Sequence, residues 1–265
     1  MGHARLPSTI LVTATLAATA LAPLATGPWV QQARAQASQN TAAPKPYKAV
    51  SITLPAALND PTFDAFRKQL SEVVQKKDRA ALTGLVAGSF FWVPEDADLA
   101  DKGKPAIDNI AKALSLDGKD APGWDALAAY AQESTAMADP QRAGVFCAPA
   151  EPTFDEKAAD DLANTTQTDA SDWAFPLRDG IEVHATAKQD SAVVDKLGLY
   201  LVRVLADDSP ANAVLATSLK VVTPSGKVGY VPVESLLPIG GEQLCYLKDA
   251  GGWKIAGFLG GEPNQ

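Results

Sequence analysis

Histidine and cysteine are scarce in this chain of 265 residues, which holds two of each. So few ligating side chains cannot assemble a zinc site of the usual spacings, and the HExxH pattern does not occur. The GxSxG turn of serine hydrolases and the glycine-rich loop that cradles phosphates do not occur either. The sequence therefore predicts no catalytic residues, no metal site and no cofactor, and we expect a protein that is not an enzyme.

Basic residues are also in short supply, with 23 Lys and Arg against 31 Asp and Glu and a net charge of −8. Since a polyanion gains nothing by releasing counter-ions against such a surface, nucleic acid is excluded as a partner. An acidic run suggests a calcium loop at first sight and comprises Glu95, Asp96, Asp98 and Asp101. Counted from Asp96, the fifth and twelfth positions hold Ala100 and Ile107, where an EF-hand needs an oxygen ligand and Glu. We therefore expect a solvated loop, with weak cation binding as the alternative.

The one long uncharged stretch, residues 10–26, follows a short N-terminal segment whose single cation is Arg5. Small residues at Ala33 and Ala35 then fit a signal-peptidase site, so we predict a signal peptide over residues 1–35 with cleavage after Ala35. The alternative is an uncleaved membrane anchor, but Pro23 interrupts the stretch and its length is at the lower limit of a span. The first cysteine is Cys147, which argues against a lipoprotein. We expect a periplasmic or secreted protein without stable membrane insertion after cleavage.

Export would place Cys147 and Cys245 in an oxidising compartment, where a disulfide between them is the simplest interpretation. Such a bond would close a long loop and remove on the order of 4 kcal/mol of denatured-state entropy in the chain-entropy model. Two separately buried thiols remain the alternative, because sequence alone does not bring the two Cα atoms within bridging distance.

Residues 36–58 are predicted to be a linker, and the segment 59–172 then follows a helical period. Prolines at first-turn positions, capping residues and apolar stripes predict five helices. They begin at Pro61, at Asp78 (with Gly88 as the stop), at Pro105, at Pro122 and at Thr153. We therefore expect a mainly α-helical N-terminal domain.

Beyond residue 172 the apolar period falls to two, which is typical of β-strands. Six short strands separated by turn residues are predicted, over residues 181–185, 199–205, 218–222, 227–231, 243–248 and 253–258. So many short strands in one segment indicate a small barrel. The predicted fold class is α+β, with a mainly α-helical domain at 59–172 followed by a small β-barrel at 173–265.

Three short motifs of the second segment, at residues 181–185, 195–198 and 226–231, resemble those of a bacterial SH3-type (SH3b) domain, which implies that the predicted barrel is SH3-like. The resemblance also includes Leu236, although His184 and Ala185 replace the usual Val-Arg pair and Tyr230 replaces a Trp. The longer stretch 60–262, with a Phe66-Arg67 helix and the ending Gly252-Trp253 to Gly261-Glu262, is similar to a set of uncharacterised exported bacterial proteins. These motifs are structural, so they imply a fold rather than an activity.

The resemblance implies binding of a peptide, of peptidoglycan or of a protein partner. The candidate binding residues are the aromatic side chains of Tyr200, Tyr230, Tyr246 and Trp253. The alternative is that Tyr230 and Trp253 fill the core and that His184 is a satisfied strand residue. The sequence thus favours a non-catalytic cell-envelope protein. One alternative is an envelope hydrolase or transferase that uses cleft carboxylates, and another is a structural or inhibitory partner of an envelope protein.

Overall fold

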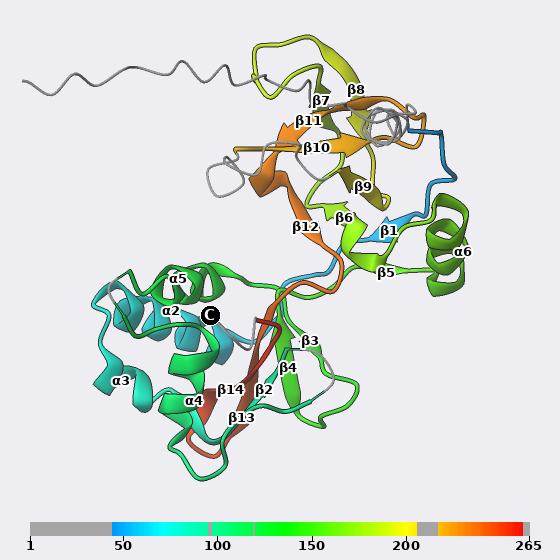
Figure 1. Cartoon of the computed structure of the whole chain (residues 1–265). Coiled ribbons are helices and arrows are strands. Elements are labelled where there is room, and N and C mark those ends of the chain that lie inside the picture. Colours follow the sequence, from blue (N-terminus) through cyan, green and yellow to red (C-terminus); the bar gives the residue numbers. More distant parts are fainter. Residues whose placement is uncertain (1–43, 95–96, 119, 206–216, 262–265) are drawn as a thin grey trace, which may run out of the picture. The chain divides into compact units, whose positions relative to one another are not determined.

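The computed structural model describes residues 44–94, 97–118, 120–205 and 217–261 (Figure 1). The predicted signal peptide and the first part of the predicted linker lie outside these residues, as do Glu95 and Asp96 of the acidic run. The described residues make up one compact unit.

A five-stranded sheet combines strands from distant parts of the sequence, in the order β2–β14–β13–β4–β3. Its strands are β2 (Val86–Val93), β3 (Met137–Ala138), β4 (Val145–Ala148), β13 (Gln243–Asp249) and β14 (Gly252–Leu259). β14 pairs antiparallel with β13 and parallel with β2, so β14 lies between the two. The parallel pair aligns Ile255 with Val86 and Phe258 with Trp92.

Helices cover one side of this sheet (Figure 1). They are α2 (Pro61–Gln75), α3 (Arg79–Thr83), α4 (Ala106–Ala113) and α5 (Gly123–Gln132). Asp60 caps α2 by accepting a hydrogen bond from the backbone N–H of Thr62 at 2.8 Å. The buried face of α2, which includes Phe63, packs with Tyr246 of β13 in one hydrophobic core.

The opposite face of the sheet holds the disulfide between Cys147 and Cys245, whose prediction is confirmed. Because side chains alternate across a strand, Tyr246 faces the helices while its neighbour Cys245 faces away from them. The two cysteines are register partners in β4 and β13, so the bond joins adjacent strands of one sheet.

A seven-stranded sheet has the order β12–β6–β9–β10–β11–β7–β8. Its strands are β6 (Trp173–Pro176), β7 (Ile181–His184), β8 (Val193–Leu197), β9 (Val202–Leu205), β10 (Ser218–Val222), β11 (Val228–Pro232) and β12 (Leu236–Pro238). Short 3-10 turns, η1 (Ala170–Asp172) and η3 (Val233–Ser235), precede β6 and β12. The core of this sheet is formed by buried aliphatic residues that include Val183, Leu197, Val221 and Val231.

A two-stranded sheet pairs β1 (Ile52–Thr53) with β5 (Thr153–Phe154), and α6 (Glu156–Thr166) follows directly. Val50 and Ile52 are buried against Trp173 and Leu201, and the Tyr47 hydroxyl donates a hydrogen bond to the carbonyl of Val222 at 2.9 Å. The end of the predicted linker is therefore part of the folded core.

The predicted fold class is wrong. The described residues form mostly β-structure, with 14 strands in three sheets and five α-helices, so a mainly helical domain at 59–172 is not what forms. The seven-stranded sheet is open, with β12 and β8 at its edges, so the predicted closed barrel is also wrong. The hairpin of β13 and β14 belongs to the five-stranded sheet with β2 and β4.

Two helix boundaries also differ from the sequence prediction. α3 ends at Thr83 rather than near Gly88, because Leu85 and Val86 turn into the sheet, where the Leu85 carbonyl accepts the Ile255 N–H. Thr153 lies in β5, and the side chain of Asp155 caps α6 by accepting the backbone N–H of Ala158.

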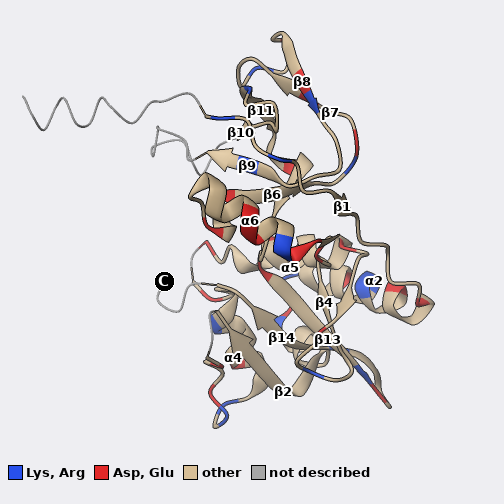
Figure 2. Ribbon diagram, turned by 90° about the vertical axis from the view of Figure 1, so that its right-hand side faces the viewer, with Lys and Arg blue, Asp and Glu red and all other residues tan. Residues whose placement is uncertain are grey.

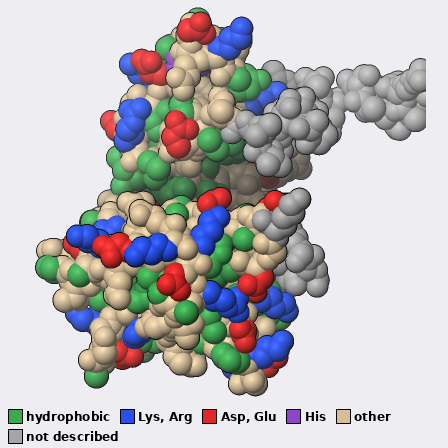
Figure 3. Space-filling view, turned by 90° about the vertical axis from the view of Figure 1, so that its left-hand side faces the viewer, with side chains coloured by type: hydrophobic (Ala, Val, Ile, Leu, Met, Phe, Trp, Pro, Cys, Tyr) green, Lys and Arg blue, Asp and Glu red, His purple; other side chains and the backbone are tan. Residues whose placement is uncertain are grey.

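Charged side chains of both signs are interspersed along the helices and loops (Figure 2) and over the face drawn in Figure 3. Several of them form ion pairs between residues three or four positions apart in sequence, such as Lys157 with Asp161, whose charged atoms are 3.0 Å apart. Such exposed pairs contribute about 0–1 kcal/mol each, so the cores rather than the ion pairs determine stability.

Candidate functional site

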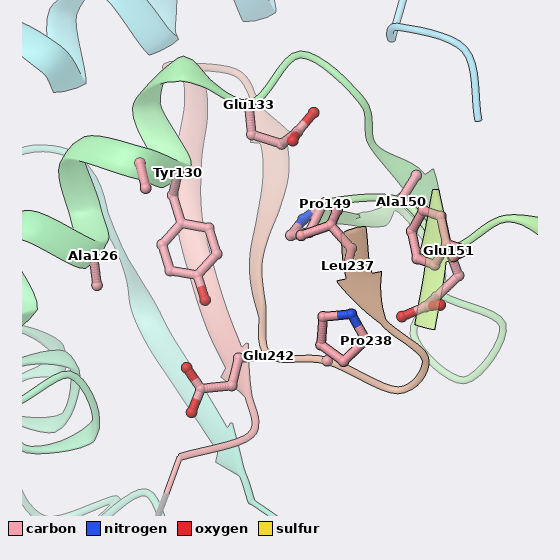
Figure 4. A pocket seen from close by; sticks show the side chains of 12 residues that line it. Ala126, Tyr130, Glu133, Pro149, Ala150, Glu151, Leu237, Pro238 and Glu242 are labelled. Atoms are coloured by element: carbon pink, nitrogen blue, oxygen red, sulfur yellow. The ribbon is translucent and has the colours of Figure 1, made fainter. Parts of the chain in front are cut away.

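The candidate site is a pocket of about 410 Å³ lined from four parts of the chain (Figure 4). These are α5, the segment after β4, the strands β6 and β12, and the turn between β12 and β13. The lining residues are Ala126, Ala129, Tyr130, Glu133, Pro149, Ala150, Glu151, Phe175, Leu237, Pro238, Gly241 and Glu242.

Three carboxylates, Glu133, Glu151 and Glu242, are the charged groups of this lining, and the described residues that line the pocket include no Lys, Arg or His. The remaining walls are mainly apolar or aromatic. Apolar walls with a few placed polar groups are typical of ligand sites, and here every charge has the same sign. The pocket therefore suits a ligand that is partly apolar and carries a positive charge.

α5 supplies one wall because four of its residues recur at helical spacing, namely Ala126, Ala129, Tyr130 and, at its C-cap, Glu133. The Tyr130 ring packs edge-on against Phe258 of β14, with ring centroids 6.2 Å apart. Its hydroxyl points toward the Glu242 carboxylate in Figure 4. Burial, and secondarily the charge of Glu242, raise the pKa of Tyr130 well above its usual value, so this hydroxyl keeps its proton.

Glu133 is held in place by the segment that follows α5. Its Oε1 accepts hydrogen bonds from the Thr135 backbone N–H at 2.6 Å and the Thr135 hydroxyl at 2.7 Å. The Thr135 hydroxyl oxygen in turn accepts the backbone N–H of Ala150 at 3.0 Å. This chain of hydrogen bonds ties the α5 wall to the segment that carries Glu151.

Glu151 is half-buried, and its Oε2 is enclosed without a hydrogen-bond partner. Burial raises the pKa of this carboxyl group, and interactions with the backbone of Gly240 and Gly241 oppose that shift. Because desolvation disfavours the charged form, Glu151 retains its proton to higher pH than an exposed glutamate does.

Glu242 is exposed at the pocket edge, and Gly260 contacts its stem. A Cβ on Gly260 would lie 2.7 Å from Cγ of Glu242, and the φ of Gly260 is +102°, which glycine adopts readily. The Gly260 carbonyl accepts the indole N–H of Trp92 at 3.0 Å, which fixes this turn to β2.

A second hollow of about 250 Å³ shares Ala126 and Glu242 with the pocket. Its other lining residues come from the end of α4, the start of α5 and the end of β14, and are Ala113, Leu114, Ser115, Pro122, Gly123, Phe258 and Gly261.

The four aromatic residues singled out from the sequence are not brought together. Tyr246 and Trp253 are 0% and 6% exposed in the core under α2, where the Trp253 indole N–H donates to the Thr62 hydroxyl at 3.0 Å. Tyr200 and Tyr230 are half-buried in the region of the seven-stranded sheet. The Tyr200 hydroxyl donates to the carbonyl of Lys196.

His184 and Asp98 both have structural partners. Nδ1 of His184 lies 3.1 Å from the carbonyl oxygen of Ser191. Asp98 accepts the backbone N–H groups of Trp92 and Ala100 and pairs with Lys102 at 2.6 Å. Within the part of the chain that the structure describes, no group of three or more His, Cys, Asp or Glu is placed to hold a metal ion.

Sequence reasoning missed the three pocket carboxylates. Two signals pointed toward them: the spacing of Ala126, Tyr130 and Glu133 on a predicted helix, and the glycine pairs at 240–241 and 260–261. Those pairs read as ordinary strand turns in the sequence. In the structure they flank Glu151 and Glu242.

No helix within residues 44–94, 97–118, 120–205 and 217–261 combines the length and the apolar character needed to cross a membrane. No family model, curated protein or solved structure matches this chain.

Proposed function

We propose that this chain is an exported, non-catalytic binding protein of the bacterial cell envelope, and that its ligand is a cationic peptide segment held in the pocket beside α5. The observation that carries the proposal is the lining of that pocket, which combines apolar walls with three glutamates and no basic residue. Charge complementarity of this kind selects partners and increases their rate of association.

Export is supported by the signal-peptide pattern over residues 1–35 and by the disulfide between Cys147 and Cys245. Disulfides persist in periplasmic and secreted proteins and are rare where thiols are kept reduced. In the envelope, cationic peptide groups have two sources, which are the free amino groups of peptidoglycan stem peptides and the lysines of other envelope proteins.

The test uses the exported protein and a peptide with blocked ends whose only charge is one lysine between apolar residues, with binding measured by calorimetry. We expect saturable binding that weakens between low and high salt, and no binding of the same peptide with glutamate in place of lysine. Glu242→Gln should weaken binding about fivefold, the loss expected for an exposed charge pair.

Glu234→Gln is the matched control, because Glu234 is an exposed glutamate of η3 outside the pocket lining. It should bind the peptide as the unaltered protein does. Equal binding of the lysine and glutamate peptides would overturn the proposal. Retention of the protein on isolated peptidoglycan, lost in Glu242→Gln, would identify stem peptides as the source of the cation, whereas binding of lysine peptides alone would favour a protein partner.

A second candidate is an envelope hydrolase or transferase, and one observation favours it. Glu151, whose pKa is raised by burial, lines the same pocket as Glu133, whose carboxylate accepts two hydrogen bonds from Thr135, so the pocket offers a candidate proton donor together with a second carboxylate. Turnover of peptidoglycan fragments that is lost in Glu151→Gln would support this candidate over the binding protein.

A further inference from the structure

The pocket and the second hollow adjoin along α5, since both are lined by Ala126 and Glu242, and the two together are called the groove here. The second hollow begins at Gly123, both hollows include Ala126, and the first continues through Ala129 and Tyr130 to Glu133. At 1.5 Å of rise per residue, the distance from Gly123 to Glu133 corresponds to about 15 Å along the helix axis. A single stripe of α5 therefore lines both hollows.

Glu242 lies at the junction of the two hollows, since it lines both. On one side of it the lining includes Tyr130, Leu237 and Pro238, and on the other side it includes Leu114 and Phe258. Glu242 is thus the charged group that both hollows share, whereas Glu133 and Glu151 line the first hollow only. A compact cation such as a lone amine would fill one hollow at most.

An extended peptide matches this spacing. Successive residues advance by about 3.4 Å in a strand, so five residues span about 14 Å, close to the length of the groove. Side chains two residues apart point to the same side, which would direct the first, third and fifth side chains of such a segment toward the groove.

We propose that the groove binds an extended segment of five residues in which the central side chain is a lysine or arginine over Glu242 and the first and fifth side chains are apolar, one in each hollow. This inference rests on the proposed function and specifies its ligand. The pattern is apolar–any–cation–any–apolar. If only one hollow bound the peptide, one of the two terminal apolar residues of this pattern would not be needed for binding.

The experiment compares that five-residue peptide with two truncated peptides, each retaining the cation and one apolar residue. Ala129 and Ser115 are exposed, and each lines one hollow only. Ala129→Trp fills the first hollow and Ser115→Trp fills the second. Because Ser115 has a φ of +57°, where a bulky side chain is strained, the free energy of unfolding of Ser115→Trp is measured first, and binding is compared under conditions in which the variant is fully folded. Each substitution should weaken binding of the full pattern about tenfold, the value of one buried apolar side chain.

Each blocking variant should leave unchanged the binding of the truncated peptide that uses only the open hollow. Gln75→Trp is the control, since Gln75 is exposed at the end of α2 and lines neither hollow. Circular dichroism checks that all three variants fold.

If Ser115→Trp binds the full pattern as tightly as the unaltered protein while Ala129→Trp loses binding, the two-hollow groove is wrong and the proposed function stands. If none of the lysine peptides binds, the proposed function itself falls. Weakening by both variants but not by Gln75→Trp supports the groove.

Discussion

At the scale of single residues, the three pocket glutamates differ in what surrounds each carboxyl group. Glu133 accepts two hydrogen bonds from Thr135, Glu242 is open to solvent, and Glu151 has one oxygen enclosed without a partner. The same side chain therefore serves as a fixed charge, as an accessible charge and as a group that resists ionisation.

Glu151 should make stability depend on pH. A carboxyl group whose pKa is raised by folding binds more protons in the folded state, so its contribution is fully present below the unfolded pKa of about 4.3 and declines as pH rises through the higher folded value. We expect Glu151→Gln to gain stability relative to the unaltered protein as pH rises through this range, measured by urea unfolding from pH 4 to 8.

Glu234→Gln is the control here as well and should follow the profile of the unaltered protein, because Glu234 is exposed. A constant difference in the free energy of unfolding between Glu151→Gln and the unaltered protein at all pH values would contradict the raised pKa.

At the scale of elements, capping residues and apolar spacing in the sequence predicted where helices occur more accurately than where they end. Asp60 and Pro61 start α2 as expected, because a capping oxygen and a proline at the first turn act within four residues. The end of α3 was missed because Leu85 and Val86 leave the helix to join β14, a strand far away in sequence. Helical spacing predicted the helix α5 but not the pocket that its outer face lines, because the rest of the pocket comes from segments 149–151 and 237–242.

The contact between α4 and α5 depends on Gly123. A Cβ at this position would lie 1.8 Å from the carbonyl oxygen of Leu114, so a side chain here forces the two helices apart. We expect Gly123→Ala to lower the free energy of unfolding by about 1–3 kcal/mol, the usual cost of overpacking, as measured by denaturant titration.

Gly88→Ala provides the matched comparison, since no atom lies within 4 Å of a Cβ built on Gly88. It should leave stability within about 0.5 kcal/mol of the unaltered protein, as surface substitutions usually do. Equal effects of the two substitutions would show that the helix contact is looser than described.

At the scale of the whole molecule, strand partners could not be predicted from sequence. The two-residue apolar period over residues 243–258 predicts a hairpin, and in the structure β13 does pair with β14, the next strand in sequence. That period carries no information about the outer partners of the hairpin, which are β4 for β13 and β2 for β14. The hairpin was therefore wrongly assigned to a barrel formed by residues 173–265 alone. Pairing across such distances depends on the complete hydrophobic core, including Phe63, Trp92 and Phe258.

The disulfide should contribute strongly to stability because it links cysteines 98 positions apart in sequence. The double variant Cys147→Ala with Cys245→Ala should lose about 4.7 kcal/mol of unfolding free energy in the chain-entropy model. Denaturant unfolding of the oxidised protein, compared with the double variant, measures this loss. Addition of a reductant should destabilise only the unaltered protein, and an equal response of both would contradict the assignment.

The position of β14 between β2 and β13 also constrains the order of assembly. Because synthesis runs from the N-terminus, β2 is made before its partner β14. The paired residues Val86 and Ile255 are more than 160 positions apart in sequence. Until β14 is made, α2 and α4 have no complete sheet to cover, because their hydrophobic core includes Tyr246 of β13 and Phe258 of β14, so this core closes only once the C-terminal hairpin has been made.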